Sequence, residues 1–233
     1  MYIYKKDSTM KKTFFLLVFL LTLLACKENP KQETTTDTLV QNTPQKIATA
    51  HGLEQWNNVT QMKFTFNVDR GENHYERSWI WNPKTKNITL ITAEDTLTYN
   101  QNTMDSIALK TDVNFINDKF WLLAPLNLAW DEGFTFDEKD SVTAPISKKN
   151  VKQLTITYGD EGGYTPGDAY DFFYNNNLQI EEWIFRKGND SLPTMVTTWE
   201  DYKDFNGIKI ATKHQNPEGT FSLYFTNIEV EKK

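Results

Sequence analysis

The hydrophobic and polar positions follow different periods along the chain, and each period predicts a different kind of segment. The first feature is an apolar run over residues 14–25, interrupted only by Thr22, that follows the basic pair Lys11-Lys12. A basic start followed by an apolar stretch of this length is typical of a secretory signal peptide. The stretch is also shorter than the roughly 20 apolar residues that cross a membrane as a helix. We therefore expect residues 1–25 to be a targeting segment.

Apolar residues recur at helical spacing in two later stretches. Thr43-Pro44 supplies an N-cap and a proline at the first helical position, and the pattern continues to Trp56. A second helix is predicted over 113–128, where Pro125 should end or kink it.

Elsewhere the period changes to two, which predicts half-buried strands. Met62–Val68 is the clearest example, because apolar and polar residues alternate throughout it. Asn206-Gly207 is the strongest hairpin signal, since a type I′ turn needs positive φ at both central residues. The other predicted strands are 75–81, 88–92, 96–99, 154–158, 170–174, 180–185, 195–202, 208–214 and 221–230.

The order of these elements predicts the fold class. One helix, a meander of strands, an inserted helix and further strands favour a mainly β (α+β) domain. Short turns favour antiparallel pairing, so we expect a single curved antiparallel sheet with a few helices on one face. This domain should occupy 43–233, after a flexible polar linker over 26–42.

The apolar run ends in Leu23-Leu24-Ala25-Cys26, which matches the lipobox of bacterial lipoprotein precursors. In such precursors the cysteine thiol receives diacylglycerol and the chain is cut before it. Cys26 is the only cysteine of the chain, so we predict lipidation there and a membrane tether through that lipid. The alternative is an ordinary secretory signal with a chance cysteine. Either Met1 or Met10 can be the true start.

Charge argues against nucleic acid as a partner. The whole chain carries a net charge of −6, and removing residues 1–25, with four lysines and one aspartate, makes it more negative. An acidic chain without a Lys/Arg cluster is a poor candidate for binding nucleic acid. Lys27 follows the predicted lipidated cysteine where an aspartate would favour inner-membrane retention, which indicates the outer membrane, with the periplasmic or surface leaflet left open.

Two motifs resemble the outer-membrane lipoprotein carrier superfamily, which includes LolA, LolB and the mycobacterial lipoprotein LppX. Trp79-Ile80-Trp81-Asn82-Pro83 is similar to that family's strand end, and the stretch 201–210 is similar to a hairpin of its sorting-type relatives. The resemblance spans about 43–233. It implies an unclosed β-barrel that covers a hydrophobic cavity, with helices as a lid on its concave face and an acyl chain as ligand.

The aromatic side chains are the candidate ligand-binding residues. The chain contains seven tryptophans and fifteen phenylalanines. They could line an apolar cavity or fill a solid core, and the pattern leaves both interpretations open. The cavity candidates are Phe66, Trp79, Trp81, Phe120, Trp121, Trp183 and Trp199.

The sequence offers no catalytic residues, cofactor or metal site that we can identify. The three histidines lack metal-ligand spacing, and no serine lies in a Gly-x-Ser-x-Gly elbow. The acidic stretch 159–168 could bind Ca²⁺, but it lacks the regular alternation of ligand residues in an EF-hand loop. We therefore interpret it as a solvated loop between strands.

These observations lead to two function hypotheses. The first is a non-enzymatic, membrane-anchored envelope lipoprotein that binds a lipid or other apolar small molecule in the concavity of its sheet. The second is an envelope lipoprotein that uses the same scaffold to dock a protein partner. A hydrolase is a third alternative, and it would need a clustered acid, base and nucleophile.

Overall fold

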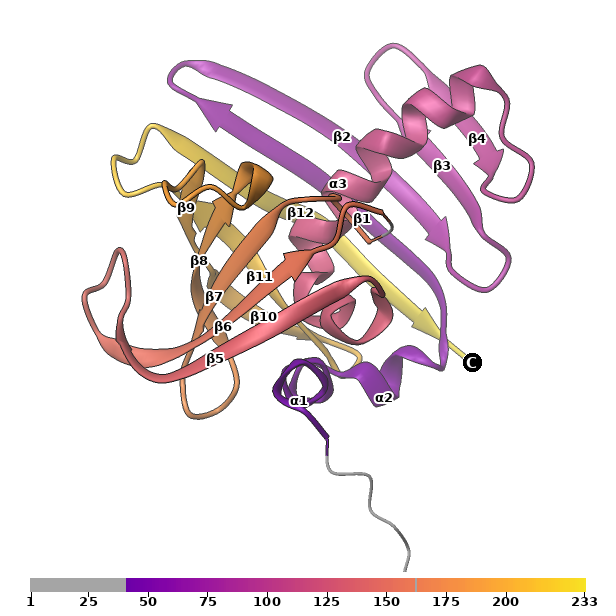
Figure 1. Cartoon of the computed structure of the whole chain (residues 1–233). Helices are drawn as coiled ribbons and strands as arrows, with labels where there is room; N and C mark the ends of the chain where they lie inside the picture. The colour runs from indigo at the N-terminus through magenta and orange to yellow at the C-terminus, as the bar shows by residue number, and fades with distance from the viewer. Residues whose placement is uncertain (1–40, 162) are drawn as a thin grey trace, which may run out of the picture. The chain divides into compact units, whose positions relative to one another are not determined.

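Two antiparallel sheets contain about half of the described residues (Figure 1). The computed structural model describes residues 41–161 and 163–233. A seven-stranded sheet has the order β10-β11-β12-β1-β2-β3-β4, and a five-stranded sheet has the order β5-β6-β7-β8-β9. The two do not close into a barrel, so the predicted antiparallel, unclosed β architecture with few helices is confirmed, with its strands divided between two ladders.

The element bounds follow most of the predicted strands, but β5 lies where no strand was predicted. The first sheet contains β1 (Val59–Arg70), β2 (Asn73–Asn82), β3 (Asn87–Ile91), β4 (Thr96–Asn100), β10 (Glu200–Phe205), β11 (Ile208–Gln215) and β12 (Phe221–Lys232). The second contains β5 (Phe134–Thr143), β6 (Asn150–Tyr158), β7 (Ala169–Tyr174), β8 (Ile180–Arg186) and β9 (Met195–Thr198). The helices are α1 (Thr43–Ala50), α2 (Leu53–Trp56), α3 (Ser106–Trp130) and the short η1 (Lys187–Asn189).

The two sheets meet at Trp199, which joins β9 to β10. Its backbone N–H donates to the carbonyl oxygen of Glu181 at 2.7 Å and so extends the pairing of β9 with β8. The next residue, Glu200, instead pairs with Lys213 in the first sheet. The prediction of one strand over 195–202 was therefore wrong, because the chain changes sheets within it.

Helix α3 lies between the two sheets (Figure 1). It begins earlier than the predicted 113–128, at the N-cap Asp105, whose carboxylate accepts hydrogen bonds from the backbone N–H groups of Ile107 and Ala108. A kink at Leu123, where φ is −128°, precedes Pro125. Proline cannot donate a helical hydrogen bond and crowds the preceding turn, so the predicted kink at Pro125 is confirmed.

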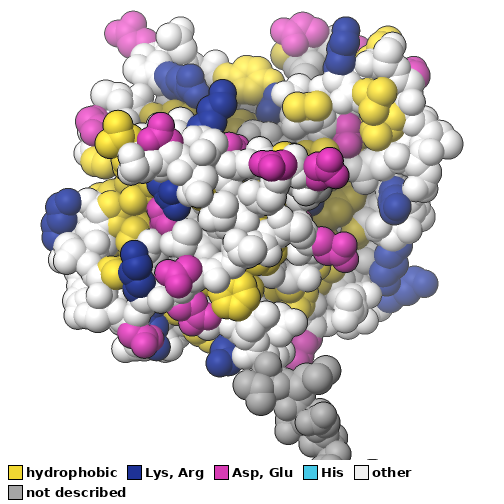
Figure 2. Space-filling model, in the orientation of Figure 1, with side chains coloured by type: hydrophobic (Ala, Val, Ile, Leu, Met, Phe, Trp, Pro, Cys, Tyr) yellow, Lys and Arg dark blue, Asp and Glu magenta, His cyan; other side chains and the backbone are white. Residues whose placement is uncertain are grey.

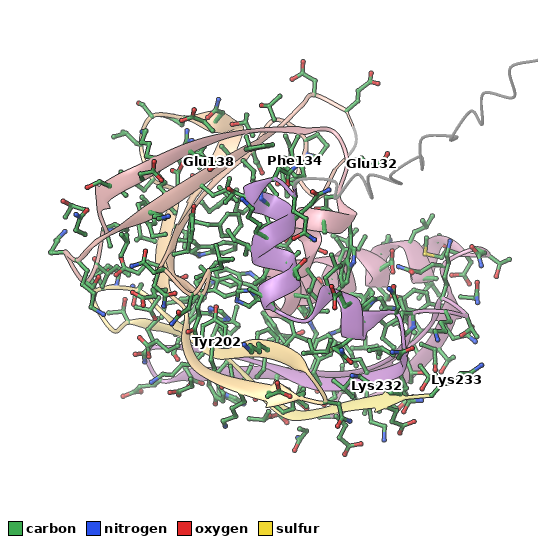
Figure 3. All side chains as sticks on the ribbon, turned by 90° about the horizontal axis from the view of Figure 1, so that it is seen from below. Glu132, Phe134, Glu138, Tyr202, Lys232 and Lys233 are labelled. Atoms are coloured by element: carbon green, nitrogen blue, oxygen red, sulfur yellow. The ribbon has the colours of Figure 1, made fainter. Side chains whose placement is uncertain are left out.

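Helices α1 and α2 cover one end of the space between the sheets. Figure 3, seen from below, shows α1 between Glu138 of β5 and Tyr202 of β10. The hydroxyl of Thr43 donates to the Glu138 carboxylate at 2.9 Å, and the rings of His51 and Tyr202 lie 5.7 Å apart. The predicted helix over 43–56 is divided at Gly52, whose φ of +99° is left-handed. The opposite end of the concavity, beside the β1–β2 hairpin, has no such cover among the described helices (Figure 1).

Candidate ligand-binding site

The concave face of the first sheet is built by alternate residues of neighbouring strands. Phe64 pairs with Trp79 and Phe66 pairs with Arg77 across β1 and β2, so all four side chains emerge on the same side of the sheet. Phe225 of β12 continues this face, with its ring 6.0 Å from Phe64 and 5.8 Å from Phe66. The inner face is therefore aromatic, with one basic residue inserted.

Helix α3 fills the concavity against the first sheet. The ring of Phe115 packs edge-on against Trp79 at 5.3 Å and against Trp81 at 5.4 Å. The second half of α3 is buried on every side, from Phe120 to Leu128. A helix that is apolar all round needs burial on all sides, and the two sheets provide it.

The second sheet contacts the same helix. Trp121 packs edge-on against Trp183 at 4.4 Å, and Phe120 stacks on Tyr164 at 3.8 Å. Tyr170 lies 5.1 Å from Phe120. The aromatic residues of the two sheets therefore pack against α3, and the helix occupies the space that an empty half-barrel would leave open.

Helix α3 is fixed to β2 by a buried ion pair. Arg77 donates two hydrogen bonds to the Asp118 carboxylate, from Nε to Oδ2 at 2.5 Å and from Nη2 to Oδ1 at 2.6 Å. The Asp118 side chain is fully buried, and that of Arg77 is 10% exposed. The indole of Trp79 donates to the same carboxylate at 2.8 Å. Two parallel bonds of this kind define the direction of both side chains as well as their separation.

The pair is also enclosed by aromatic rings. The Arg77 guanidinium lies 5.3 Å from the ring centre of Phe66 and 5.4 Å from that of Tyr75, a geometry that favours cation–π attraction. Burial raises the pKa of Asp118, while the donors on Arg77 and Trp79 act in the opposite direction. Because arginine stays protonated in proteins, removing Asp118 would leave a buried cation without its partner.

A groove opens beside this ion pair, at the end of the concavity that α1 does not cover. Its volume is about 340 Å³, and it is bounded by β1, β2 and α3. In Figure 2, hydrophobic and basic side chains surround a dip at the top of the face, over β2 and α3. The lining residues are Phe66, Val68, Arg70, Asn73, His74, Tyr75, Arg77 and Asn117.

Arg70 connects this groove to a second hollow. Its side chain borders both, and its guanidinium lies 5.4 Å from the ring centre of Phe221. The second hollow has a volume of about 540 Å³ and extends toward Met195 and Pro217. The open end of the concavity thus combines apolar walls with an exposed cation, which suits an amphiphilic ligand.

The structure brings the seven predicted aromatic candidates into one core. All are buried in the same hydrophobic cluster, but only Phe66 also borders the groove. Trp79 and Trp81 face α3 from β2, Phe120 and Trp121 lie on α3 itself, and Trp183 and Trp199 belong to the second-sheet side. Their contact with a ligand stays a prediction. The predicted lipidation site, Cys26, lies outside the described residues.

Sequence reasoning missed the polar residues of this region, Arg70, Arg77 and Asp118. The available signal was Asp118, which stands between Phe115 and Phe120 on the apolar side of a predicted helix. A carboxylate at a buried helical position requires a partner, and that requirement could have directed attention to an inward-facing arginine.

The three histidines differ in their burial. His51 is buried, with Nδ1 2.8 Å from the Ile47 carbonyl oxygen, and His74 is exposed beside Asp69. His214 is fully buried. Within 41–161 and 163–233, no group of three His, Cys, Asp or Glu residues has the geometry to hold a metal ion. None of the helices in those same ranges has both the length and the apolar character needed to cross a membrane.

Comparisons with known proteins place this geometry in a fold family. No protein-family model matches the sequence, and a search of curated proteins finds no match. A LolA superfamily protein from Nitrosomonas europaea superimposes with a TM-score of 0.50 and 9% identity, over 83% of this chain and 96% of that one.

Two further structures superimpose less well. One is described as an outer membrane lipoprotein-sorting protein domain from Vibrio parahaemolyticus, with a TM-score of 0.45 and 9% identity over 82% of this chain and 94% of that one. The other is a DUF1329 family protein from Desulfovibrio piger, with a TM-score of 0.44 and 10% identity over 81% of this chain and 93% of that one. On its sheet architecture and the first of these superpositions, the chain has a LolA-like fold.

Proposed function

We propose that this protein is a lipid-anchored lipoprotein of the cell envelope that binds a lipid or another apolar ligand without catalysing a reaction. The observation that carries the proposal is the groove at the open end of the concavity. Its apolar walls, formed by Phe66, Val68 and Tyr75, suit a hydrocarbon chain. The exposed cation of Arg70 at the same end suits an anionic or polar head group.

The packing of α3 sets how deeply such a ligand can enter. With α3 in place, a hydrocarbon chain can occupy the groove beside Asn117 but not the space already filled by Phe115 and Phe120. A deeper site requires α3 to move away from β2, and that movement breaks the pair between Arg77 and Asp118. The ion pair would thus set the resistance to deep entry.

The proposed location depends on the N-terminal segment. Lipidation of Cys26 would tether the domain to a membrane, and Lys27 at the next position favours the outer membrane by analogy with lipoprotein sorting. A domain held in this way acts as a fixed receiver or holder of its ligand and not as a diffusing shuttle.

Binding of an acyl chain can be tested on the purified full chain. We expect a fluorescent long-chain fatty acid to bind saturably to the delipidated protein. Val68→Arg, in the groove wall, should weaken that binding at least tenfold, because a charged side chain replaces apolar surface. The matched control is Val113→Arg on the exposed face of α3, which should bind the probe like the native chain. Binding that is absent, or equal in both variants, would count against the groove.

A second function has its own supporting observation. The N-terminal half of α3 exposes Leu109 and Val113, which lie one turn apart on the same face of the helix and outside the groove. An exposed apolar patch on a helix is typical of a surface that contacts a protein partner. In cells, Val113→Arg should then abolish a crosslinked product that Val68→Arg preserves.

A further inference from the structure

Four buried side chains at the junction of the two sheets share unused hydrogen-bonding capacity. Among the described residues, five buried side-chain polar atoms find no hydrogen-bond partner, and four of them belong to Trp183, Thr197, Trp199 and His214. These side chains, here called the junction cluster, are between 0 and 3% exposed. Buried polar atoms in folded proteins nearly always have a partner, so four orphans in one place need an explanation.

The strands bring the junction cluster together. Thr197 of β9 is paired with Trp183 of β8, and Trp199 follows two residues later on the same face. The rings of Trp183 and Trp199 are 5.5 Å apart, and those of Trp199 and His214 are 4.5 Å apart. The four orphan atoms therefore belong to neighbouring side chains on the inner side of the junction.

The protonation of His214 determines what the junction cluster lacks. Its Nδ1 lies 3.2 Å from the carbonyl oxygen of Thr198, so Nδ1 carries the proton and donates it there. Burial lowers the pKa of His214 to about 3, and the ring is neutral at neutral pH. Its orphan Nε2 is consequently an acceptor, with no proton of its own to give.

The other three orphans have a different requirement. The two indole Nε1 groups of Trp183 and Trp199 can only donate, and the Thr197 hydroxyl can donate or accept. A bare carbonyl or a carboxylate could accept from the indoles but would leave His214 Nε2 without a donor. An ammonium group would satisfy Nε2 but not the indoles. A hydroxyl satisfies both, because it accepts from the two indoles through its lone pairs and donates its proton to Nε2. An alcohol has no further bond to offer, whereas the second proton of a water molecule can also bond the Thr197 oxygen.

We propose that the junction cluster is a binding site for one neutral hydroxyl group, supplied by an internal water molecule or by the alcohol group of a small ligand. A hollow of about 480 Å³ borders Trp199 and lies between the loop at Ile146 and the side chain of Tyr202. This site is independent of the groove at the open end, so the proposal is tested separately from the binding of an acyl chain.

Two substitutions that each remove one polar atom test the site. Thr197→Val keeps the side-chain volume, and if water occupies the site the melting temperature of the full chain should fall by roughly 2–4 °C. Trp199→Phe also removes ring volume, so its loss is compared with that of Trp79→Phe, whose indole N–H is used; a hydroxyl from either source should make the two losses similar. A level or raised melting temperature in Thr197→Val, together with a clearly smaller loss in Trp199→Phe than in Trp79→Phe, overturns the proposal.

A control and a direct measurement strengthen the test. Trp79→Phe removes an indole that donates to Asp118 at 2.8 Å, so it calibrates the loss expected for a used indole N–H. The indole N–H signals of Trp183 and Trp199 in the ¹⁵N-labelled chain should show cross-peaks to a bound hydroxyl proton. Indole signals without such a cross-peak, together with unchanged stability, would exclude a bound hydroxyl group.

The source of the hydroxyl is then separated by extraction with organic solvent. If a ligand supplies it, native mass spectrometry should show a bound mass that extraction removes, and Trp199→Phe should lose that mass. If water supplies it, no such mass is present, and the drop in melting temperature of both variants persists after extraction. Either result supports the hydroxyl site and identifies its occupant.

Discussion

Arg77 of β2 and Asp118 of α3 form the only buried bidentate ion pair between the central helix and a sheet within the described residues. They are 41 positions apart in the sequence, and their bonds connect the inner face of the first sheet to the middle of the helix that fills it. Because both side chains are withdrawn from water, each charge depends on the other.

Breaking this pair from one side should strongly destabilise the protein. Asp118→Leu leaves the Arg77 cation buried and unpaired, and we expect the free energy of unfolding to fall by about 3–5 kcal/mol. Denaturant unfolding of the full chain measures this loss. The double variant Arg77→Met with Asp118→Leu should recover most of it, because no buried charge remains. If the single and double variants were equally unstable, packing and not charge would be the cause.

The joint between α1 and α2 should tolerate no side chain at Gly52. A Cβ built there lies 2.2 Å from the carbonyl oxygen of Gly207, and φ is +99°. Gly52→Ala must therefore move the β10–β11 turn as well as adopt a left-handed conformation, and we expect more than about 2 kcal/mol of destabilisation in denaturant unfolding.

The matched control is Gly219→Ala. Its φ of +68° is also left-handed, but nothing lies within 4 Å of the added Cβ. This variant should therefore cost only about 1 kcal/mol, the conformational part of the penalty. Equal losses at the two glycines would show that the contact with Gly207 is unimportant.

Two buried histidines should make the fold sensitive to mild acid. Burial lowers the pKa of His51 to about 4 and that of His214 to about 3, whereas both titrate near 6.5 in the unfolded chain. Below pH 6.5 the unfolded state binds protons that the folded state does not, so stability is full above that pH and declines toward pH 4. The expected slope is about 1 kcal/mol per pH unit for each histidine.

Variants at the histidines assign this slope. His51→Gln should reduce the slope measured between pH 6.5 and 5 by about half, since one of the two protonation differences is removed. His74 is the control, because its pKa is raised by the hydrogen bond to Asp69 and its contribution is lost as pH rises, not as pH falls. If His74→Gln and not His51→Gln flattened the acid slope, the assignment would be wrong.

Cys26→Ser tests the proposed tether. Without a thiol, the precursor cannot receive diacylglycerol, so incorporation of labelled palmitate should disappear and the protein should leave the membrane fraction. Met10→Ala, made without the change at Cys26, separates the two candidate starts. Expression should be lost if translation begins at Met10 and kept if it begins at Met1. Labelling that persists in Cys26→Ser would contradict a lipid on this residue.

The strands that bury one face were predictable from the sequence. Alternation over Met62–Val68 gave the centre of β1, because its apolar residues are buried on the inner face of the sheet. The polar residues Thr65 and Asn67 on the opposite face are buried as well, through hydrogen bonds to Ser78 and to the Tyr224 carbonyl oxygen. The turn at Asn206-Gly207 is confirmed, with φ of 54° and 84° at the two residues. In these places a local pattern and its tertiary environment agree.

The strand β5 could not be predicted in this way. Its residues Phe134–Thr143 are mostly exposed and only Phe134 and Val142 are partly buried, so no buried face imposes an alternation on them. The first turns of α3 were missed for a related reason, since Ile107 and Leu109 face solvent and break the helical stripe. Edge strands and exposed helix ends carry little periodic signal.

The candidate site was only partly predictable. The aromatic core follows from residue type, but the partner of Asp118 depends on how α3 crosses β2, which no local pattern specifies. The same holds for the junction cluster, where β9 and β11 meet through the change of sheet at Trp199. Long-range register, and not residue preference, creates both sites.

The pairing of β1 with β12 has a consequence for the order in which the chain folds. These neighbours at the centre of the first sheet are contributed by the beginning and the end of the described chain, and Val59 is paired with Lys232. Contacts of such large sequence separation slow folding, because a long loop must close before they form. The sheet cannot be completed before β12 has been synthesised. For a precursor with the export signal proposed for residues 1–25, slow closure of this pairing would favour the unfolded state that translocation requires.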